Sequence, residues 1–107
     1  MQPKVLVIIP AYNEQEAILN TVRAVQSYGF DYIVVNDGSK DDTLAVCHKN
    51  NLHVLDLAQN LGIGGAVQAG HKYALRNGYD VDIQVDGDGQ HDPGYLQDLV
   101  DEITKGA

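Results

Sequence analysis

A short acidic segment holds the residues of this chain whose types and spacing best suit chemistry. Asp86 and Asp88 stand two positions apart, directly after the apolar run from Val81 to Val85. Side chains two apart on an extended chain project to the same side, so the two carboxylates would converge. Converging carboxylates repel each other unless a cation joins them, and Mg2+ or Mn2+ takes oxygen ligands and can also hold a diphosphate. The segment therefore predicts a site for a divalent metal.

The alternative for the acidic segment is a polar turn, in which the aspartates make only local hydrogen bonds. Its position after an apolar run favours the metal site, and Gly87 and Gly89 would remove side chains that block a ligand. A calcium-binding EF-hand loop is excluded. Counted from Asp86, that pattern requires glycine at the sixth position and glutamate at the twelfth, where this chain has His91 and Gln97.

Asp37 is a second acidic residue that follows an apolar run. An acid at the end of the second strand accepts hydrogen bonds from the nucleoside in dinucleotide-binding folds, so we expect the same role for Asp37. The alternative is that Asp37 and Gly38 only form the turn, while Ser39 or Asp41 caps the next helix. For Asp41 and Asp42 we prefer this capping role.

Tyr12, Asn13 and Glu14 follow the first apolar run. The Tyr12 ring could cover a base, and Asn13 and Glu14 could bond a nucleoside. Asn13 could equally cap the following helix.

A glycine-rich stretch, Gly62 to Gly65, stands at the predicted start of another helix, a place that suits anions. Close packing of that helix against a sheet explains the same glycines equally well. No Gly-Lys-Ser/Thr follows, which excludes a P-loop, and Val67 replaces the last glycine of the dinucleotide fingerprint.

The elements that must position these residues alternate along the chain. Apolar, β-branched runs predict strands, and apolar residues at helical spacing predict helices between and after them. The alternation predicts the α/β class, a Rossmann-like parallel sheet with helices on both faces and ligand-binding loops at the carboxyl ends of the strands. The expected strands are Val5 to Ile9, Tyr32 to Val35, Leu52 to Leu55 and Val81 to Val85, and the expected helices are Glu14 to Ser27, Asp41 to Asn50, Gly65 to Arg76 and Tyr95 to Thr104.

Composition limits the other possibilities. A length of 107 residues with 44% hydrophobic residues predicts a single domain. No segment has the length or apolarity of a membrane helix or signal peptide. The single cysteine, Cys47, is expected to be a free thiol in the core, which favours a reducing, cytoplasmic setting. A formal net charge of −8 disfavours nucleic acid, and the histidines lack the spacing of a zinc site.

Four motifs of this chain together resemble the family 2 glycosyltransferases of the GT-A fold, and within them the dolichol-phosphate mannose synthase and polyprenyl-phosphate glycosyltransferase branch. The resemblance covers essentially the whole chain, in the expected order, and its last motif is the most specific. The motifs are Ile9 to Glu14, Val35 to Ser39 with Asp42 and Thr43, Asn60 to Gly62, and Val85 to Pro93.

The resemblance implies an inverting transfer of a sugar from a nucleoside diphosphate sugar to a polyprenyl (dolichyl-type) phosphate, at the cytoplasm or the cytoplasmic membrane face. It also implies that Gln90 reaches the Mg2+ or Mn2+ ion beside Asp86 and Asp88. We identify no general base in this chain. The donor-binding residues that we expect are Pro10, Ala11, Tyr12, Glu14, Asp37, Gly38, Asp86, Gly87 and Asp88.

Members of this family continue beyond the acidic segment into an acceptor-binding half. We therefore expect residues 1–107 to be one nucleotide-sugar-binding domain, truncated before that half and open to self-association through the surface it exposes. The alternative is a nucleotide-sugar-binding module without transferase activity. A nucleotidyltransferase is disfavoured, because its loop after the first strand is typically rich in glycine and basic residues, whereas the segment from Pro10 to Glu14 is neither.

Overall fold

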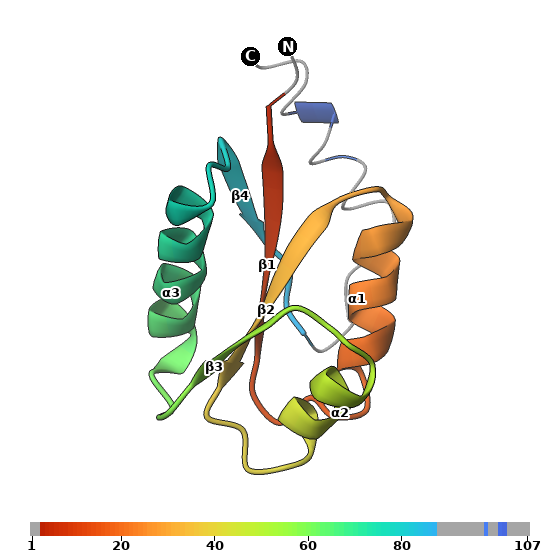
Figure 1. The fold of residues 1–107 in the computed structure, drawn as a ribbon, viewed down its shortest axis with the longest axis vertical. Coiled ribbons are helices and arrows are strands. Elements are labelled where there is room, and N and C mark those ends of the chain that lie inside the picture. The colour runs from red at the N-terminus through yellow and green to blue at the C-terminus, as the bar shows by residue number, and fades with distance from the viewer. Residues whose placement is uncertain (1–2, 88–97, 99–100, 103–107) are drawn as a thin grey trace.

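The computed structural model describes residues 3–87, 98 and 101–102 of the chain. Within this part, strands and helices alternate along the chain (Figure 1). The elements are β1 Val5–Ala11, α1 Ile18–Ser27, β2 Asp31–Asp37, α2 Thr43–Lys49, β3 Val54–Leu57, α3 Gly62–Arg76 and β4 Val81–Gln84.

The described strands form one parallel sheet in the order β3-β2-β1-β4. The two central strands, β1 and β2, are buried over nearly their whole length, which explains their uninterrupted apolar sequences. The chain runs outward from β1 to β3 and then crosses back to place β4 beside β1. The strand order thus reverses between β1 and β4, where ligands bind in sheets of this kind.

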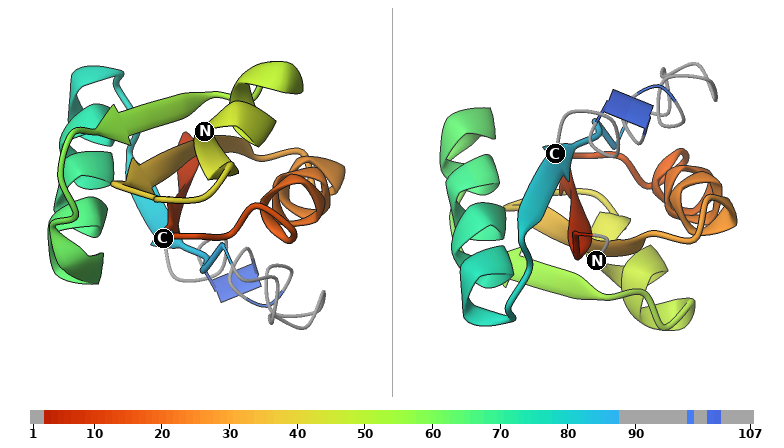
Figure 2. Two further views of the ribbon diagram at one scale, coloured as in Figure 1. Left: turned by 90° about the horizontal axis from the view of Figure 1, so that it is seen from below. Right: turned by 90° about the horizontal axis from the view of Figure 1, so that it is seen from above.

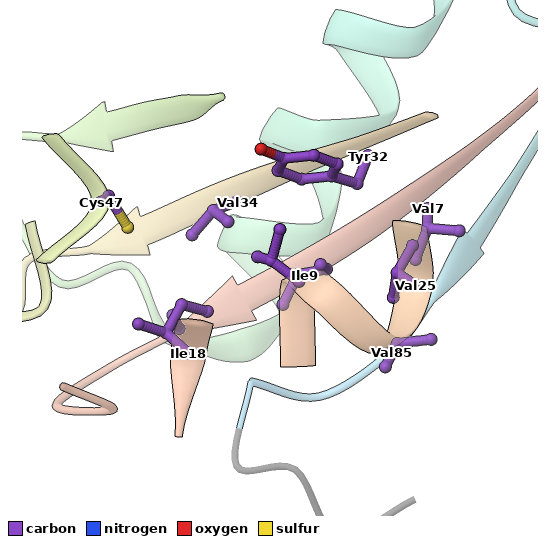
Figure 3. Close-up of a cluster of buried hydrophobic side chains, with 10 residues drawn as sticks. Val7, Ile9, Ile18, Val25, Tyr32, Val34, Cys47 and Val85 are labelled. Atoms are coloured by element: carbon purple, nitrogen blue, oxygen red, sulfur yellow. The ribbon is translucent and has the colours of Figure 1, made fainter. Parts of the chain in front are cut away.

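Helices cover both faces of the sheet, with α3 on one face and α1 and α2 on the other (Figures 1 and 2). Successive residues of β1 supply the two cores, because side chains alternate along a strand. Ile8 packs toward Ala66 and Ala74 of α3. Ile9 belongs to the opposite core, which also contains Cys47 of α2 (Figure 3). The predicted α/β class and the two-faced arrangement are confirmed, and Cys47 is a fully buried core residue.

The third strand begins later than predicted, at Val54 instead of Leu52. Asn51 has a left-handed backbone (φ 55°), and the Leu52 N–H donates to the carbonyl oxygen of Cys47 at 2.9 Å. This pair of features ends α2 in the manner of a Schellman motif. The apolar Leu52 therefore belongs to the C-terminal end of α2 and not to the strand.

All three described helices begin at other residues than predicted. Helix α2 starts at Thr43, two residues after the predicted Asp41. Helix α1 starts at Ile18 and not at Glu14. The Glu14 carbonyl accepts from the N–H groups of Ala17 and Ile18 in a turn that precedes the helix. The Glu14 N–H donates to Thr43 Oγ1 at 2.8 Å. Helix α3 starts at Gly62, three residues before the predicted Gly65. The predicted helix from Tyr95 to Thr104 falls almost entirely outside the described residues. Among those that are described, no helix is long and apolar enough to cross a membrane.

Candidate functional site

A cleft of about 340 Å3 opens at the carboxyl ends of the central strands, beside the reversal of strand order. Its walls come from the loops that follow β1, β2 and β4 and from the first turns of α3. The described residues that line it are Pro10, Ala11, Tyr12, Glu14, Asp37, Ile63, Ala66, Asp86 and Gly87.

The fold thus brings together residues that the sequence analysis predicted from three separate loops. Of the predicted donor-binding residues that are described, all line the cleft except Gly38. Asp88 and Gln90 lie outside the described residues. Ile63 and Ala66 were not predicted as donor-binding residues. Ile63 lies within the glycine-rich stretch from Gly62 to Gly65, and Ala66 directly follows it.

The cleft is acidic. Glu14, Asp37 and Asp86 contribute carboxyl groups, and no lysine or arginine is found among the described residues that line it. A diphosphate entering such a site would meet only like charge, unless a cation came with it.

Asp37 is only 4% exposed, and one oxygen of its carboxylate is hydrogen-bonded within the protein. Oδ1 accepts a hydrogen bond from the Leu61 N–H at 2.7 Å, just before α3. Asp37 therefore lines the cleft and also holds Leu61, the residue that directly precedes α3.

Asn13 does not cap α1, and its side-chain oxygen is engaged within the protein. Its backbone is left-handed (φ 54°), and its Oδ1 accepts hydrogen bonds from the N–H groups of Lys40 and Asp41 at 2.8 and 3.3 Å. Ser39 Oγ in turn accepts from the Asn13 N–H at 3.0 Å. Asn13 therefore ties the loop after β1 to the loop after β2, and it does not cap α1.

Asp41 caps the start of α2, as preferred from the sequence. Its Oδ1 accepts hydrogen bonds from the N–H and the hydroxyl of Thr43, and its Oδ2 accepts from the Gln15 N–H at 3.3 Å. Desolvation raises the pKa of the Asp41 carboxyl, but the hydrogen bonds from Thr43 and Gln15 together bring that pKa below its ordinary value. Asp42 makes no side-chain capping bond, although it stands at the N-cap position.

The start of the acidic segment lies against the carboxyl end of β1. The Gly87 N–H donates to the carbonyl oxygen of Pro10 at 3.2 Å, and a Cβ at position 87 would lie 3.0 Å from that same oxygen. A side chain at position 87 would therefore crowd the end of β1, and glycine suits this close approach. Gln84 Nε2 donates to Asp86 Oδ1 at 3.0 Å, which orients one oxygen of the predicted metal ligand.

The glycines at the start of α3 do not pack this helix against the sheet. A Cβ at Gly62 or Gly64 would meet nothing within 4 Å. The close contact lies further along the helix, where a Cβ at Gly70 would come within 2.5 Å of Cγ2 of Ile8. Close packing is therefore not the reason for Gly62 and Gly64.

The predicted metal ligands can be tested only in part against this geometry. Asp86 is half-buried at the cleft, with a carboxylate oxygen of the kind that Mg2+ and Mn2+ bind. Residues 3–87, 98 and 101–102 alone contain no group of three or more His, Cys, Asp or Glu side chains that could hold a metal ion. The donor chemistry of Asp86 fits the metal, and the remaining protein ligands would have to come from outside this part.

Comparison with known proteins places this cleft in context. The model of the family described as glycosyl transferase family 2 matches residues 6–107. The chain is 38% identical to polyprenol monophosphomannose synthase of Mycolicibacterium smegmatis, with 97% of the chain and 42% of that protein covered. It is 35% identical to a UDP-N-acetylglucosamine–dolichyl-phosphate N-acetylglucosaminyltransferase of Methanococcus voltae, with 92% of the chain and 47% of that protein covered. The chain thus spans less than half the length of these relatives.

The fold resembles that of solved structures. Glucosyl-3-phosphoglycerate synthase from Mycobacterium tuberculosis, in complex with Mn2+ and UDP-glucose, superposes with a TM-score of 0.77 at 23% identity. The match covers 97% of this chain and 40% of that one. At this identity, the likeness supports the architecture of the sheet and its helices.

Proposed function

Because the chain belongs to glycosyl transferase family 2, we propose that it is the donor-binding part of a metal-dependent enzyme that transfers a sugar, with inversion, from a nucleoside diphosphate sugar to a polyprenyl phosphate. The relatives named above act on polyprenol or dolichyl phosphate by their names, which supports the lipid acceptor. A location in the cytoplasm or at the cytoplasmic membrane face is part of the same proposal.

The observation that carries the proposal is the acidic cleft at the strand-order reversal. Tyr12 and Ile63 are 41% and 60% exposed there and offer apolar surface to a planar base, while Asp37 offers a hydrogen-bond acceptor. The diphosphate would lie toward Asp86, the predicted metal ligand. Nucleoside and diphosphate thus meet chemically different walls.

Asp86, with Asp88 and Gln90, would hold a Mg2+ or Mn2+ ion together with the diphosphate. When bound, the metal supplies positive charge that offsets the charge developing on the departing diphosphate. Tyr12 and Asp37 would fix the nucleoside, so that the sugar is presented in a constant position. Glycine at position 87 lets the segment after β4 lie close to Pro10.

The chain spans 42% of its polyprenol-phosphate relative. Transfer requires donor and acceptor to be held together, so we propose that residues 1–107 by themselves bind the donor without transferring the sugar. Turnover of a polyprenyl phosphate by the 107-residue chain would refute this part of the proposal.

Linkage between metal and nucleotide tests the site directly. Calorimetric titration of the chain with UDP and with GDP, each with Mn2+, with Mg2+ and with excess chelator, should show that the metal tightens one or both nucleotides about tenfold or more, with the reciprocal effect on the metal. Asp88→Asn should abolish most of this coupling. Asp42→Asn removes the same charge from an exposed carboxylate outside the cleft-lining set, and should leave the coupling intact. Equal nucleotide affinity with metal and with chelator would refute metal-dependent donor binding.

A further inference from the structure

The third loop, Asn60 to Gly62, engages Asp37 from two directions. The Leu61 N–H donates to Asp37 Oδ1 at 2.7 Å, and Asn60 Nδ2 donates to the Asp37 carbonyl oxygen at 3.2 Å. One bond fixes the side chain of Asp37 and the other fixes its backbone. A carboxylate with both its backbone and one oxygen held has little freedom left to rotate.

Asn60 also shapes the loop that carries the Leu61 N–H. Its Oδ1 accepts from the Gly62 N–H at 3.1 Å, two residues along the chain, so the side chain closes a turn around Leu61. The same side chain therefore points the Leu61 N–H at Asp37 and anchors the loop to the Asp37 carbonyl. Asn60 is itself exposed, so its side chain contributes little to the core.

The close approach of the two loops requires the glycine beside Asp37. Gly38 has a φ of 67°, and a Cβ there would lie 2.6 Å from the Asn60 nitrogen, well inside contact distance. Gly38 is not among the residues that line the cleft, and its glycine is explained by this close packing. Asp37 bonds the third loop, and the absence of a side chain at Gly38 leaves room for that loop.

We propose that Asn60 is a positioning residue for nucleoside binding, which acts by holding Asp37 so that Oδ2 faces the ligand. Oδ1 is occupied by the Leu61 N–H, which leaves Oδ2 as the acceptor for an N–H or O–H group of the nucleoside. The acceptor-only chemistry of this oxygen selects ligands that donate at that point. This inference rests on the proposed donor-binding function.

The test compares Asn60→Ala with Asn77→Ala in the 107-residue chain. Asn77 is a matched control, because its exposed side chain also donates to a backbone carbonyl, that of Tyr73 at 2.8 Å, but lies outside the set of cleft-lining residues. Calorimetry with Mn2+ present gives the affinities for UDP, GDP and pyrophosphate. Amide hydrogen exchange by NMR reports on the Leu61 N–H in the same variants.

Asn60→Ala should weaken the better-bound nucleoside diphosphate about three- to tenfold, the worth of one or two hydrogen bonds, and leave pyrophosphate affinity unchanged. The Leu61 amide should exchange faster, whereas Asn77→Ala should change neither property. Asp37→Asn keeps an oxygen for Leu61 but presents a donor to the ligand. It should weaken nucleotide binding more than Asn60→Ala while the Leu61 amide stays protected.

Two outcomes would overturn the inference and leave the proposed function standing, and a third would overturn both. Unchanged nucleotide affinity in Asn60→Ala, with the unaltered chain binding normally, would remove Asn60 from nucleoside binding. An equal loss of pyrophosphate affinity would mean a general disturbance of the cleft instead of a positioning role. An unaltered chain that binds neither UDP nor GDP would refute the donor-binding function and this inference with it.

Discussion

The contact between Gly70 of α3 and Ile8 of β1 sets how closely this helix can approach the sheet, and it supports a quantitative prediction. Ile8 is fully buried on the central strand, and a Cβ at position 70 would lie 2.5, 3.0 and 3.1 Å from three of its side-chain carbons. Carbon atoms in favourable contact are about 3.5–4.0 Å apart, so Gly70→Ala must move the helix or the Ile8 side chain by about 1 Å. A β-branched side chain enclosed in a core has few alternative rotamers.

Two opposing effects decide the result. Alanine in a helix interior is favoured over glycine by about 1 kcal/mol, whereas overpacking a tight core costs about 1–3 kcal/mol. We therefore expect Gly70→Ala to lower the free energy of unfolding by about 0–2 kcal/mol. Gly64→Ala is the matched control, because it lies in the same helix and its Cβ would meet nothing within 4 Å. It should keep the propensity gain and raise the free energy of unfolding by up to about 1 kcal/mol.

Urea unfolding followed by circular dichroism measures both variants on a common scale. The difference between them, about 1–3 kcal/mol, is the cost of the contact with Ile8, since the propensity terms largely cancel. Ile8→Ala would remove the clashing carbons, so its combination with Gly70→Ala should cost less than the sum of the two single changes. Equal stabilisation by alanine at positions 64 and 70 would refute the close approach of α3 to β1.

The remaining predictions concern Thr43, Asp41 and Cys47, which lie in α2 or just before it. Thr43→Val should lower the free energy of unfolding by about 1–3 kcal/mol, because the Glu14 N–H loses its buried acceptor, whereas Thr43→Ser should cost less; chemical denaturation compares them. Since the pKa of Asp41 is lowered in the folded chain, its stabilising contribution should be present above the ordinary value of 3.8 and be lost as the pH falls further below it. NMR titration should find that pKa raised in Thr43→Val, and an unchanged value would contradict the network. Burial raises the pKa of Cys47, so its thiol should resist alkylation at neutral pH until urea unfolds the chain; rapid labelling of the native chain would contradict its core position.

Much of the fold could be predicted from the sequence because strands and helices leave local patterns of apolar residues. The uninterrupted apolar runs at Val5 and Tyr32 became the two central strands, since strands buried on both faces carry no polar alternation. The third strand was misplaced by two residues. Its apolar Leu52 serves the end of α2, and a left-handed Asn51 cannot be distinguished from an ordinary loop residue by periodicity.

The cleft itself could be predicted because parallel strands bring their carboxyl ends to one edge. Residues more than seventy positions apart, such as Tyr12 and Asp86, therefore converge once the order of elements is known. The hydrogen bonds between the loops could not be predicted in this way. Asn13 and Asn60 bond partners that are distant in sequence, and each has a plausible local role as a cap or turn residue that sequence alone cannot exclude.

The loops of the cleft are organised by two different means, and this division bears on how the site would work. Around Asp37, side chains outside the cleft-lining set fix the geometry. Asn13 joins the loop after β1 to the loop after β2, and Asn60 joins the loop before α3 to Asp37. Ordering these loops costs nothing further when a nucleoside binds, because their conformational entropy is already lost in the folded chain. Asp86 is oriented by Gln84, yet the carboxylates around it repel a diphosphate until a cation is present. Under the proposed function, the base-binding wall is therefore preformed by the protein, while the diphosphate-binding wall is completed only when metal and nucleotide arrive together.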